Sequence, residues 1–273
     1  MFSLEQKLIA LDLDGTTLNA DSLISKKTKD VLQRASQEGH IVSIVTGRPF
    51  RISKNYYDEL NLKTPMINFN GALGHIPYRH WQNEYQDTFS REIAFDLLKN
   101  KDTLGIKLIA AEAKSMMLAD SVNSLIDGFF PTALAKSQVL NEHNLVDDPA
   151  SITLLVEEKS KEKIITALKE NYGDYIEIGV WGGKNPILEL APKGITKEKG
   201  VRLLANDFKI DRKNIIAFGD EHNDYEMIDY AGWGVVMKNG TETLKKISND
   251  ITNLDNTKDG LAIYLEKYLG LAQ

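Results

Sequence analysis

The chain has 273 residues, of which 42% are hydrophobic and 26% are charged, which is typical of a folded protein and excludes a disordered one. A formal net charge of −6 does not favour nucleic acid or an anionic membrane as partner, and no segment approaches the ~20 apolar residues of a membrane span. The absence of cysteine excludes disulfides, thiolate nucleophiles and cysteine metal sites, and it fits a cytoplasmic location.

Strands and helices alternate in the first part of the chain. We expect a buried strand over 7–13, a helix from Ser25 to Glu38, a strand over 40–48, a helix over 51–60, and a strand over 65–72 that runs into a turn. Ser25 is the expected N-cap of the first helix, and Gly39 is its expected stop. This alternation predicts a parallel sheet with right-handed crossovers.

The pattern changes between about Glu84 and Leu190. Here we expect helices at 91–100 and 160–171 and strands at 106–111, 114–118, 152–157, 175–180 and 187–190. The first two of these strands are predicted to form a hairpin. In this segment Trp181, Gly182 and Gly183 are expected either as a substrate-facing loop or as a turn with a packed tryptophan. We interpret the segment as an inserted α+β domain with its own small core.

After Pro192 the first pattern returns, with a helix near 196–206, a strand over 214–220, a helix near 223–230, a strand over 232–237 and two further helical stretches. The predicted fold class is therefore α/β, with a Rossmann-like parallel-sheet core. The core is expected to be discontinuous, comprising 1–83 and 192–273, and the inserted α+β cap domain is expected over 84–191.

Unusual polar residues end four of the predicted core strands. They are Asp12-Leu13-Asp14-Gly15, Thr46-Gly47-Arg48, Asn68-Phe69-Asn70-Gly71 and Gly219-Asp220. In an open parallel sheet, ligands bind beyond the carboxyl ends of the strands, so we expect these residues to converge on one site.

Paired carboxylates are the main chemical signal of the predicted site. Asp12 and Asp14 are two residues apart, so along a strand they would point to the same side. Two close carboxylates repel each other when both are ionised, and a divalent cation neutralises that repulsion. Asp220 and Asp224 add negative charge, and an oxygen-only cluster suits Mg²⁺. A carboxylate can also act as nucleophile while its neighbour acts as acid and base.

Several of these residues also have structural interpretations. Asp-Gly is a common turn dipeptide, although the whole Asp-x-Asp-Gly-Thr run is expected by chance in well under ~1% of chains this long. Thr46 either offers a hydroxyl to phosphate or caps the next turn. Lys197 either binds phosphate or is a solvated lysine at a charged helix start, and His222 is expected at the surface.

Taken together, these motifs resemble the haloacid dehalogenase-like phosphatases of the Cof type over nearly the whole chain. The resemblance implies that Asp12 is the nucleophile and that Asp14 is the general acid and base, which also gives a backbone oxygen to Mg²⁺. It implies a metal site formed by Asp12, Asp14, Asp220 and Asp224. It also implies phosphate- or substrate-binding roles for Leu13, Thr46, Gly47, Arg48, Asn70, Gly71, Lys197 and Asn223. Glu198 is a departure, because the family usually has glycine after the lysine.

The expected function is a Mg²⁺-dependent phosphatase that hydrolyses small phosphorylated metabolites, chiefly sugar phosphates, through an aspartyl-phosphate. The inserted cap would close over the core site and select the leaving group. Two alternatives remain open, a phosphomutase on the same core and a non-catalytic binder of phosphorylated ligands. The partner is expected to be the small phosphorylated metabolite, and the chain is expected to be a monomer or a weak dimer.

Overall fold

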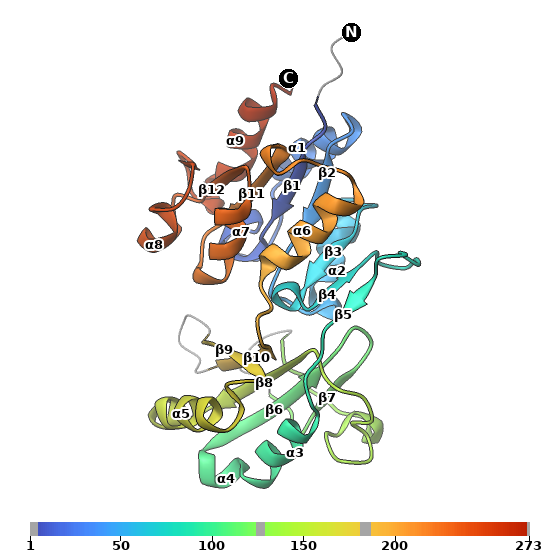
Figure 1. Ribbon diagram of the computed structural model, residues 1–273, viewed down its shortest axis with the longest axis vertical. Coiled ribbons are helices and arrows are strands. Elements are labelled where there is room, and N and C mark those ends of the chain that lie inside the picture. The colour runs from blue at the N-terminus through green and yellow to red at the C-terminus, as the bar shows by residue number, and fades with distance from the viewer. Residues whose placement is uncertain (1–4, 124–128, 181–186, 272–273) are drawn as a thin grey trace. The chain divides into compact units, whose positions relative to one another are not determined.

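The computed structural model describes residues 5–123, 129–180 and 187–271, which form two compact units (Figure 1). The first unit takes in residues 5–48, 53–85 and 196–271. The second takes in residues 49–52 and the described part of 86–195. The expected loop at Trp181–Gly183 lies outside the described residues.

A parallel sheet forms the centre of the first unit, with the strand order β13-β12-β11-β1-β2. Its strands are β1 (Leu8–Leu11), β2 (Ile41–Ile44), β11 (Ile215–Gly219), β12 (Trp233–Val236) and β13 (Asp250–Ile251). β1 pairs in parallel with β2 on one side and with β11 on the other, and all four of its residues are buried. This confirms the predicted parallel sheet, because a strand covered on both faces is apolar throughout.

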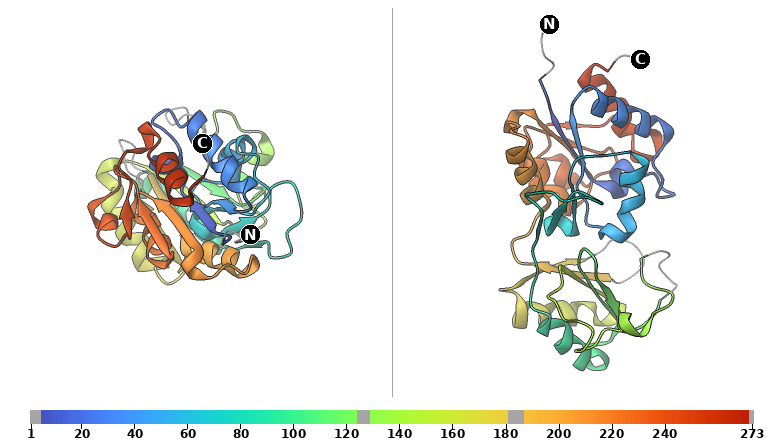
Figure 2. Two further views of the ribbon diagram at one scale, coloured as in Figure 1. Left: turned by 90° about the horizontal axis from the view of Figure 1, so that it is seen from above. Right: turned by 90° about the vertical axis from the view of Figure 1, so that its right-hand side faces the viewer.

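Helices cover both faces of this sheet. They are α1 (Lys26–Gln37), α2 (Phe50–Glu59), α6 (Lys197–Asp207), α7 (Tyr225–Tyr230), α8 (Glu242–Lys245) and α9 (Gly260–Leu269). α1 packs with α9 on one face, and α6 packs with α7 on the other (Figure 2). Ser25 caps α1 as predicted, because its side chain accepts a hydrogen bond from the Thr28 backbone N–H.

A smaller sheet has the strand order β3-β4-β5, with β3 (Met66–Asn68), β4 (Leu73–His75) and β5 (Tyr85–Gln86). β3 continues the main sheet through a parallel bridge between Val45 and Ile67. Short helical turns lie at Leu13–Thr17, Phe69–Gly71, Lys136–Gln138, Glu158–Ser160, Arg212–Asn214, His222–Asp224 and Asn256–Lys258. Three of these turns follow β1, β3 and β11, so they carry the polar residues at the ends of those strands.

The second unit contains an antiparallel sheet with the order β7-β6-β8-β10-β9. Its strands are β6 (Ile106–Glu112), β7 (Met117–Ala119), β8 (Ser151–Val156), β9 (Ile176–Val180) and β10 (Ile187–Pro192), and its helices are α3 (Glu92–Lys99), α4 (Lys101–Leu104) and α5 (Lys161–Tyr172). Leu97 of α3 and Ile164 of α5 share an apolar cluster with Ile109, Leu154 and Leu188 of the sheet. The predicted hairpin is confirmed, since Ala110 of β6 lies opposite Ala119 of β7.

Some elements differ from their predictions. The strands expected over 7–13 and 65–72 end earlier, at Leu11 and Asn68, because the chain turns there. β4, β5, β13 and α4 were not predicted, and each is only two to four residues long. Within the described ranges, the structure has no helix with the length and apolar character needed to cross a bilayer.

Candidate active site

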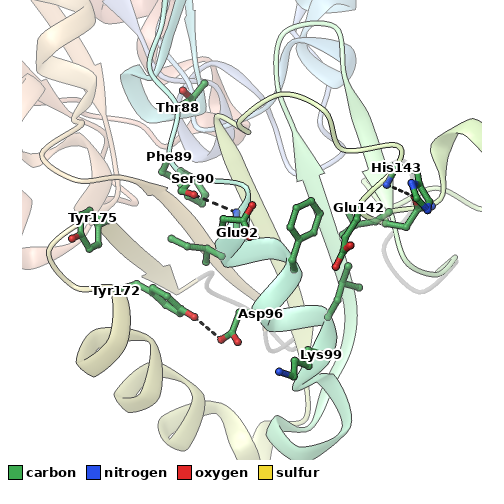
Figure 3. Close-up of a pocket in the computed structure, with 15 residues that line it drawn as sticks. Thr88, Phe89, Ser90, Glu92, Asp96, Lys99, Glu142, His143, Tyr172 and Tyr175 are labelled. Atoms are coloured by element: carbon green, nitrogen blue, oxygen red, sulfur yellow. Dashed lines mark hydrogen bonds between the residues drawn. The ribbon is translucent and has the colours of Figure 1, made fainter.

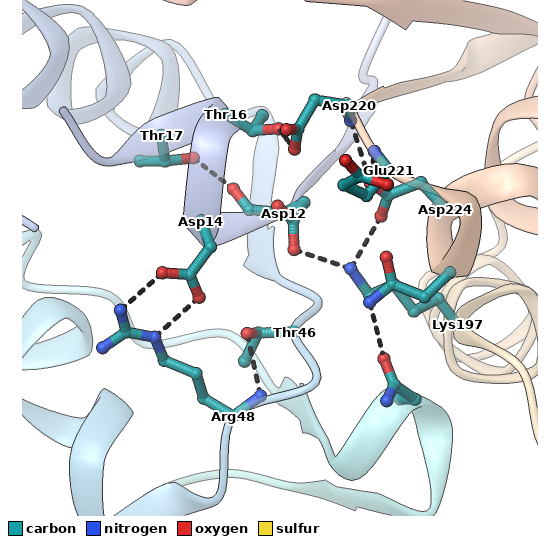
Figure 4. A network of polar contacts seen from close by, with 12 residues as sticks. Asp12, Asp14, Thr16, Thr17, Thr46, Arg48, Lys197, Asp220, Glu221 and Asp224 are labelled. Atoms are coloured by element: carbon teal, nitrogen blue, oxygen red, sulfur yellow. Dashed lines mark hydrogen bonds and ion pairs between the residues drawn. The ribbon is translucent and has the colours of Figure 1, made fainter. Parts of the chain in front are cut away.

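The polar residues that follow the strands of the first unit meet at one edge of its sheet (Figure 4). Asp12 follows β1, Thr46 follows β2, and Asp220 follows β11. Lys197, the first residue of α6, lies between Asp12 and Asp224. The convergence expected from the sequence is therefore present in the structure.

Three buried carboxylates form the centre of this site. Asp12, Asp220 and Asp224 each offer an oxygen, and these oxygens lie within 4.8 Å of one another. Burial raises the pKa of Asp12 well above its usual value, against the attraction of Lys197. Burial, helped by the charge of Asp224, also raises the pKa of Asp220 to about 7. Three close, buried carboxylates that offer only oxygen ligands fit a divalent cation.

Lys197 is part of this cluster and not of the solvated surface. Its side chain is buried, and its Nζ donates to Asp12 Oδ1 and to Asp224 Oδ1, both at 2.6 Å. Burial alone would lower the pKa of Lys197, but the two carboxylates outweigh burial and raise it. The alternative of a solvated lysine is therefore wrong. Glu198 does not disturb the cluster, since its Oε1 accepts from Arg202 Nε at 2.6 Å along the same helix.

Asp224 also shapes the loop that carries Asp220. Its Oδ2 accepts from the backbone N–H of Asp220 at 2.9 Å and from that of Glu221 at 3.2 Å. Thr16 holds the Asp220 side chain by donating from Oγ1 to Oδ1 at 2.9 Å. Hydrogen bonds from the segment after β1 and from the loop after β11 thus hold the Asp220 and Asp224 side chains in place. His222 lies at the surface of this loop, as expected.

The Asp14 carboxylate does not join the three others. The strand ends before it, and the chain turns through Gly15, which has φ +73°. A Cβ at Gly15 would lie 2.1 Å from Asp220 Oδ2, so this position needs glycine. The Asp14 side chain, which is 57% exposed, instead pairs with Arg48, whose Nε lies 2.7 Å from Oδ2 and whose Nη2 lies 2.5 Å from Oδ1. The expectation that Asp12 and Asp14 share one side of a strand is wrong, because a turn replaces the strand.

Thr46 and Asn70 order the backbone beside the cluster. Thr46 Oγ1 accepts from the Arg48 N–H at 3.1 Å, as the turn-cap alternative expects. Asn70, at φ +54°, accepts from Asn223 Nδ2 at 3.0 Å, so the ends of β3 and β11 are joined. A Cβ on Gly47 would lie 2.9 Å from Asn70 Oδ1. Contacts of these residues with phosphate stay predictions.

Leu13 and Gly71 can offer a ligand little beyond their backbone. The Leu13 side chain is fully buried, and the Gly71 carbonyl accepts from Tyr85 Oη at 2.8 Å. Sequence reasoning missed Asn239, whose Nδ2 donates to the Gly15 carbonyl at 2.8 Å and so fixes the Asp14–Gly15 turn. No local pattern could have found it, because the contact spans 224 positions of the chain.

A cavity of about 1200 Å³ lies elsewhere, within the second unit (Figure 3). It is lined by α3, by residues 140–143, and by Tyr172 and Tyr175. Tyr172 Oη donates to Asp96 Oδ2 across part of this lining, at 2.5 Å. None of the lining residues belongs to the carboxylate cluster, so the cluster and not this cavity is the candidate active site.

Comparisons with known proteins point to one family. The family described as haloacid dehalogenase-like hydrolase matches residues 9–265. The 5-amino-6-(5-phospho-D-ribitylamino)uracil phosphatase YitU of Bacillus subtilis (strain 168) is 34% identical over 265 residues, 97% of this chain and 98% of that protein. YwtE of the same organism, named for the same activity, is 27% identical over 284 residues, 96% of this chain and 98% of that protein.

A solved structure shows the same relationship. The crystal structure of a haloacid dehalogenase-like hydrolase from Bacteroides thetaiotaomicron matches with a TM-score of 0.79 and 27% identity, covering 97% of this chain and 100% of that one. The family match and the similar phosphatases thus extend over almost the whole chain, both units included. The chain belongs to the haloacid dehalogenase-like hydrolases, in the Cof-type phosphatase group, and is a phosphoric monoester hydrolase.

Proposed function

We propose that this chain is a Mg²⁺-dependent phosphatase that hydrolyses small sugar phosphates through an aspartyl-phosphate on Asp12. One observation carries the proposal, the buried group of Asp12, Asp220 and Asp224 with Lys197 between two of its members. A carboxylate held by a buried ammonium group at the end of the central strand is suited to attack phosphorus. Bound Mg²⁺ would be held by Asp12, Asp220 and Asp224, with the Asp14 backbone, and would neutralise the charge of the cluster and of the phosphate.

The first half-reaction transfers the phosphoryl group to the protein. An Asp12 carboxylate oxygen attacks phosphorus as the bond from phosphorus to the leaving oxygen breaks, and Asp14 gives a proton to that oxygen. Lys197 binds Asp12 Oδ1 and so fixes the orientation of the nucleophile. Thr46 and Asn223 are proposed to hold the phosphate oxygens while this occurs.

The second half-reaction restores Asp12. Asp14, now ionised, accepts a proton from water as the water oxygen attacks phosphorus, and the bond between phosphorus and Asp12 breaks. Inorganic phosphate is released, and Asp14 is again protonated. The exposed position of the Asp14 side chain supports this role, since the group must meet both the leaving oxygen and water.

We further propose that residues 84–191 act as the cap domain that selects the leaving group. The two similar proteins named for 5-amino-6-(5-phospho-D-ribitylamino)uracil suggest a first compound to test, because its phosphate sits on a sugar-alcohol chain. The cytoplasmic location and the monomeric or weakly dimeric state stay predictions.

The test is phosphate release from 4-nitrophenyl phosphate and from a panel of sugar phosphates, with Mg²⁺ and with chelator. We expect Mg²⁺-dependent release that Asp12→Asn abolishes, because an amide cannot form the acyl-phosphate. A phosphomutase would instead move phosphate within a sugar without steady release. A non-catalytic binder would bind these compounds without turnover, and either result would overturn the proposal.

A further inference from the structure

Arg48 meets Asp14 through both carboxylate oxygens, as Figure 4 shows. A bidentate contact of this kind fixes the rotation of a carboxylate as well as its position, which a single hydrogen bond cannot do. Asp14 has no other hydrogen-bond partner that would hold its exposed side chain among the contacts described for it. Arg48 is therefore the group that sets where the Asp14 carboxylate lies.

Arg48 is itself held from the opposite side. Its Nη1 donates to Tyr56 Oη at 3.3 Å, and its guanidinium carbon lies 5.4 Å from the centre of the Tyr56 ring. Tyr56 in turn donates from Oη to the Ser22 carbonyl at 2.9 Å. The Arg48 backbone is fixed as well, through the Thr46 side chain. A chain of contacts thus runs from Ser22 through Tyr56 and Arg48 to Asp14.

We propose that Arg48, braced by Tyr56, is a positioning residue that aims the Asp14 carboxylate at the leaving oxygen, and that it does not bind the phosphate. This inference rests on the proposed function. These bonds use three of the five guanidinium N–H groups, and they turn Nε and Nη2 toward Asp14 and Nη1 toward Tyr56, so a phosphate would find only one N–H left on each Nη nitrogen. One Asp14 oxygen can exchange the proton while Arg48 keeps the other.

The test compares two substrates of nearly the same shape, phenyl phosphate and 4-nitrophenyl phosphate. Phenol is about as weak an acid as the tyrosine side chain, with a pKa near ~10, so phenolate needs a proton as it leaves. The 4-nitrophenolate ion is stabilised by its nitro group and leaves without one. The quantity measured is kcat/KM, which covers the steps up to departure of the leaving group and excludes hydrolysis of the aspartyl-phosphate.

For Arg48→Gln we expect kcat/KM for phenyl phosphate to fall about tenfold further than kcat/KM for 4-nitrophenyl phosphate, because a misaimed acid loses part of its 10²–10⁴-fold contribution. Tyr56→Phe should also lower kcat/KM more for phenyl phosphate than for 4-nitrophenyl phosphate, but by a smaller factor than Arg48→Gln. Arg48→Lys should recover only part of the loss, because an ammonium group cannot bind both oxygens. In an Asp14→Asn background, Arg48→Gln should lower kcat/KM for the two substrates by the same factor, because the acid that it positions is already absent.

Binding of inorganic phosphate, measured by calorimetry, supplies a readout independent of turnover, and we expect Arg48→Gln to leave it within about twofold. Equal losses on both substrates together with weaker phosphate binding would overturn the proposal and make Arg48 a phosphate ligand. If Arg48→Gln does not fold, the Tyr56→Phe and Arg48→Lys comparisons decide the question in the same way. No release by the folded wild type from either compound or from the sugar phosphates would overturn the proposed function, and this role of Arg48 with it.

Discussion

Lys197 contributes the one positive charge in contact with the buried carboxylates, as far as the described contacts extend. It neutralises part of the repulsion between Asp12 and Asp224, and it joins the end of β1 to the loop after β11. A buried charge that loses its partner is far more costly than an exposed one, because water cannot replace the partner. The stability of the metal-free first unit should therefore depend strongly on this residue.

We expect Lys197→Met to lower the free energy of unfolding by about 3–5 kcal/mol in the presence of chelator, because two buried carboxylates lose their cation. Urea unfolding followed by circular dichroism, fitted with a separate transition for each unit, measures this. The matched control is Lys27→Met, which removes a half-exposed lysine of the same unit, paired with Glu266, and should cost no more than about 1 kcal/mol. Equal losses for the two variants would contradict the assigned role of Lys197.

Asp220 should make the metal-free protein less stable as pH rises. Its pKa is raised from 3.8 to about 7 in the folded protein, first by burial and then by the charge of Asp224. The folded state thus holds a proton that the unfolded state has lost, so this stabilisation is full below pH ~4 and is lost as pH rises through about 7.

With chelator present, we expect the wild type to lose stability relative to Asp220→Asn as the pH rises from 5 to 7.5. The change should not exceed about 1.4 kcal/mol per pH unit. Urea unfolding at both pH values checks it, with the asparagine variant as the reference that cancels the titrating groups distant from Asp220. Parallel pH dependences for the two proteins would contradict the raised pKa.

The turn over Leu13–Thr17 is the element on which the geometry of the site depends most. We expect Gly15→Ala to weaken Mg²⁺ binding by tenfold or more, because its Cβ would collide with the Asp220 carboxylate as well as straining the backbone. Titration calorimetry with Mg²⁺ measures this loss.

Gly39→Ala is the matched control for Gly15→Ala. Gly39 also has a positive φ, of +91°, but a Cβ there meets nothing within 4 Å. Gly39→Ala should therefore lower the free energy of unfolding by about 1–2 kcal/mol through backbone strain and leave the Mg²⁺ affinity unchanged. Similar Mg²⁺ affinities for the two variants would show that the collision with Asp220 does not matter.

The longer elements could be predicted from sequence because their apolar patterns are local. In α1, for example, Val31, Leu32 and Ala35 form the buried face. β13 has only two residues, which is too short to show a period of two. In the site, Asp12, Asp220 and Asp224 follow from motifs at strand ends. The direction of Asp14 does not, because it depends on how the Gly15 turn is folded, and the burial of Lys197 depends on partners 185 and 27 positions away.

At the scale of the whole molecule, the carboxylate cluster lies entirely in one of the two units. Each unit has its own apolar core, so unfolding is not expected to be a single two-state transition. A ligand that binds only the folded first unit stabilises that unit alone. The stabilisation amounts to about 2.7 kcal/mol when the free ligand is at a hundred times its dissociation constant.

We therefore expect Mg²⁺ to raise the midpoint of one thermal transition and to leave the other in place, as measured by scanning calorimetry. Fluorescence of a Trp181→Phe variant identifies the transition that moves, since the two remaining tryptophans, Trp81 and Trp233, both lie in the first unit. Asp220→Asn is the control and should abolish the shift. A shift that survives in this variant would place the metal elsewhere.

The position of β1 between β2 and β11 has a consequence for how the protein is made. β1 emerges first from the ribosome, but its partner β11 follows roughly 200 residues later, which takes about 10–40 s of translation. During that interval the apolar first strand has one free edge, while the whole second unit has already been synthesised and can fold. A chain whose translation stops before Lys197 has Asp12 without Lys197, Asp220 and Asp224, so truncated products should be inactive and prone to aggregate.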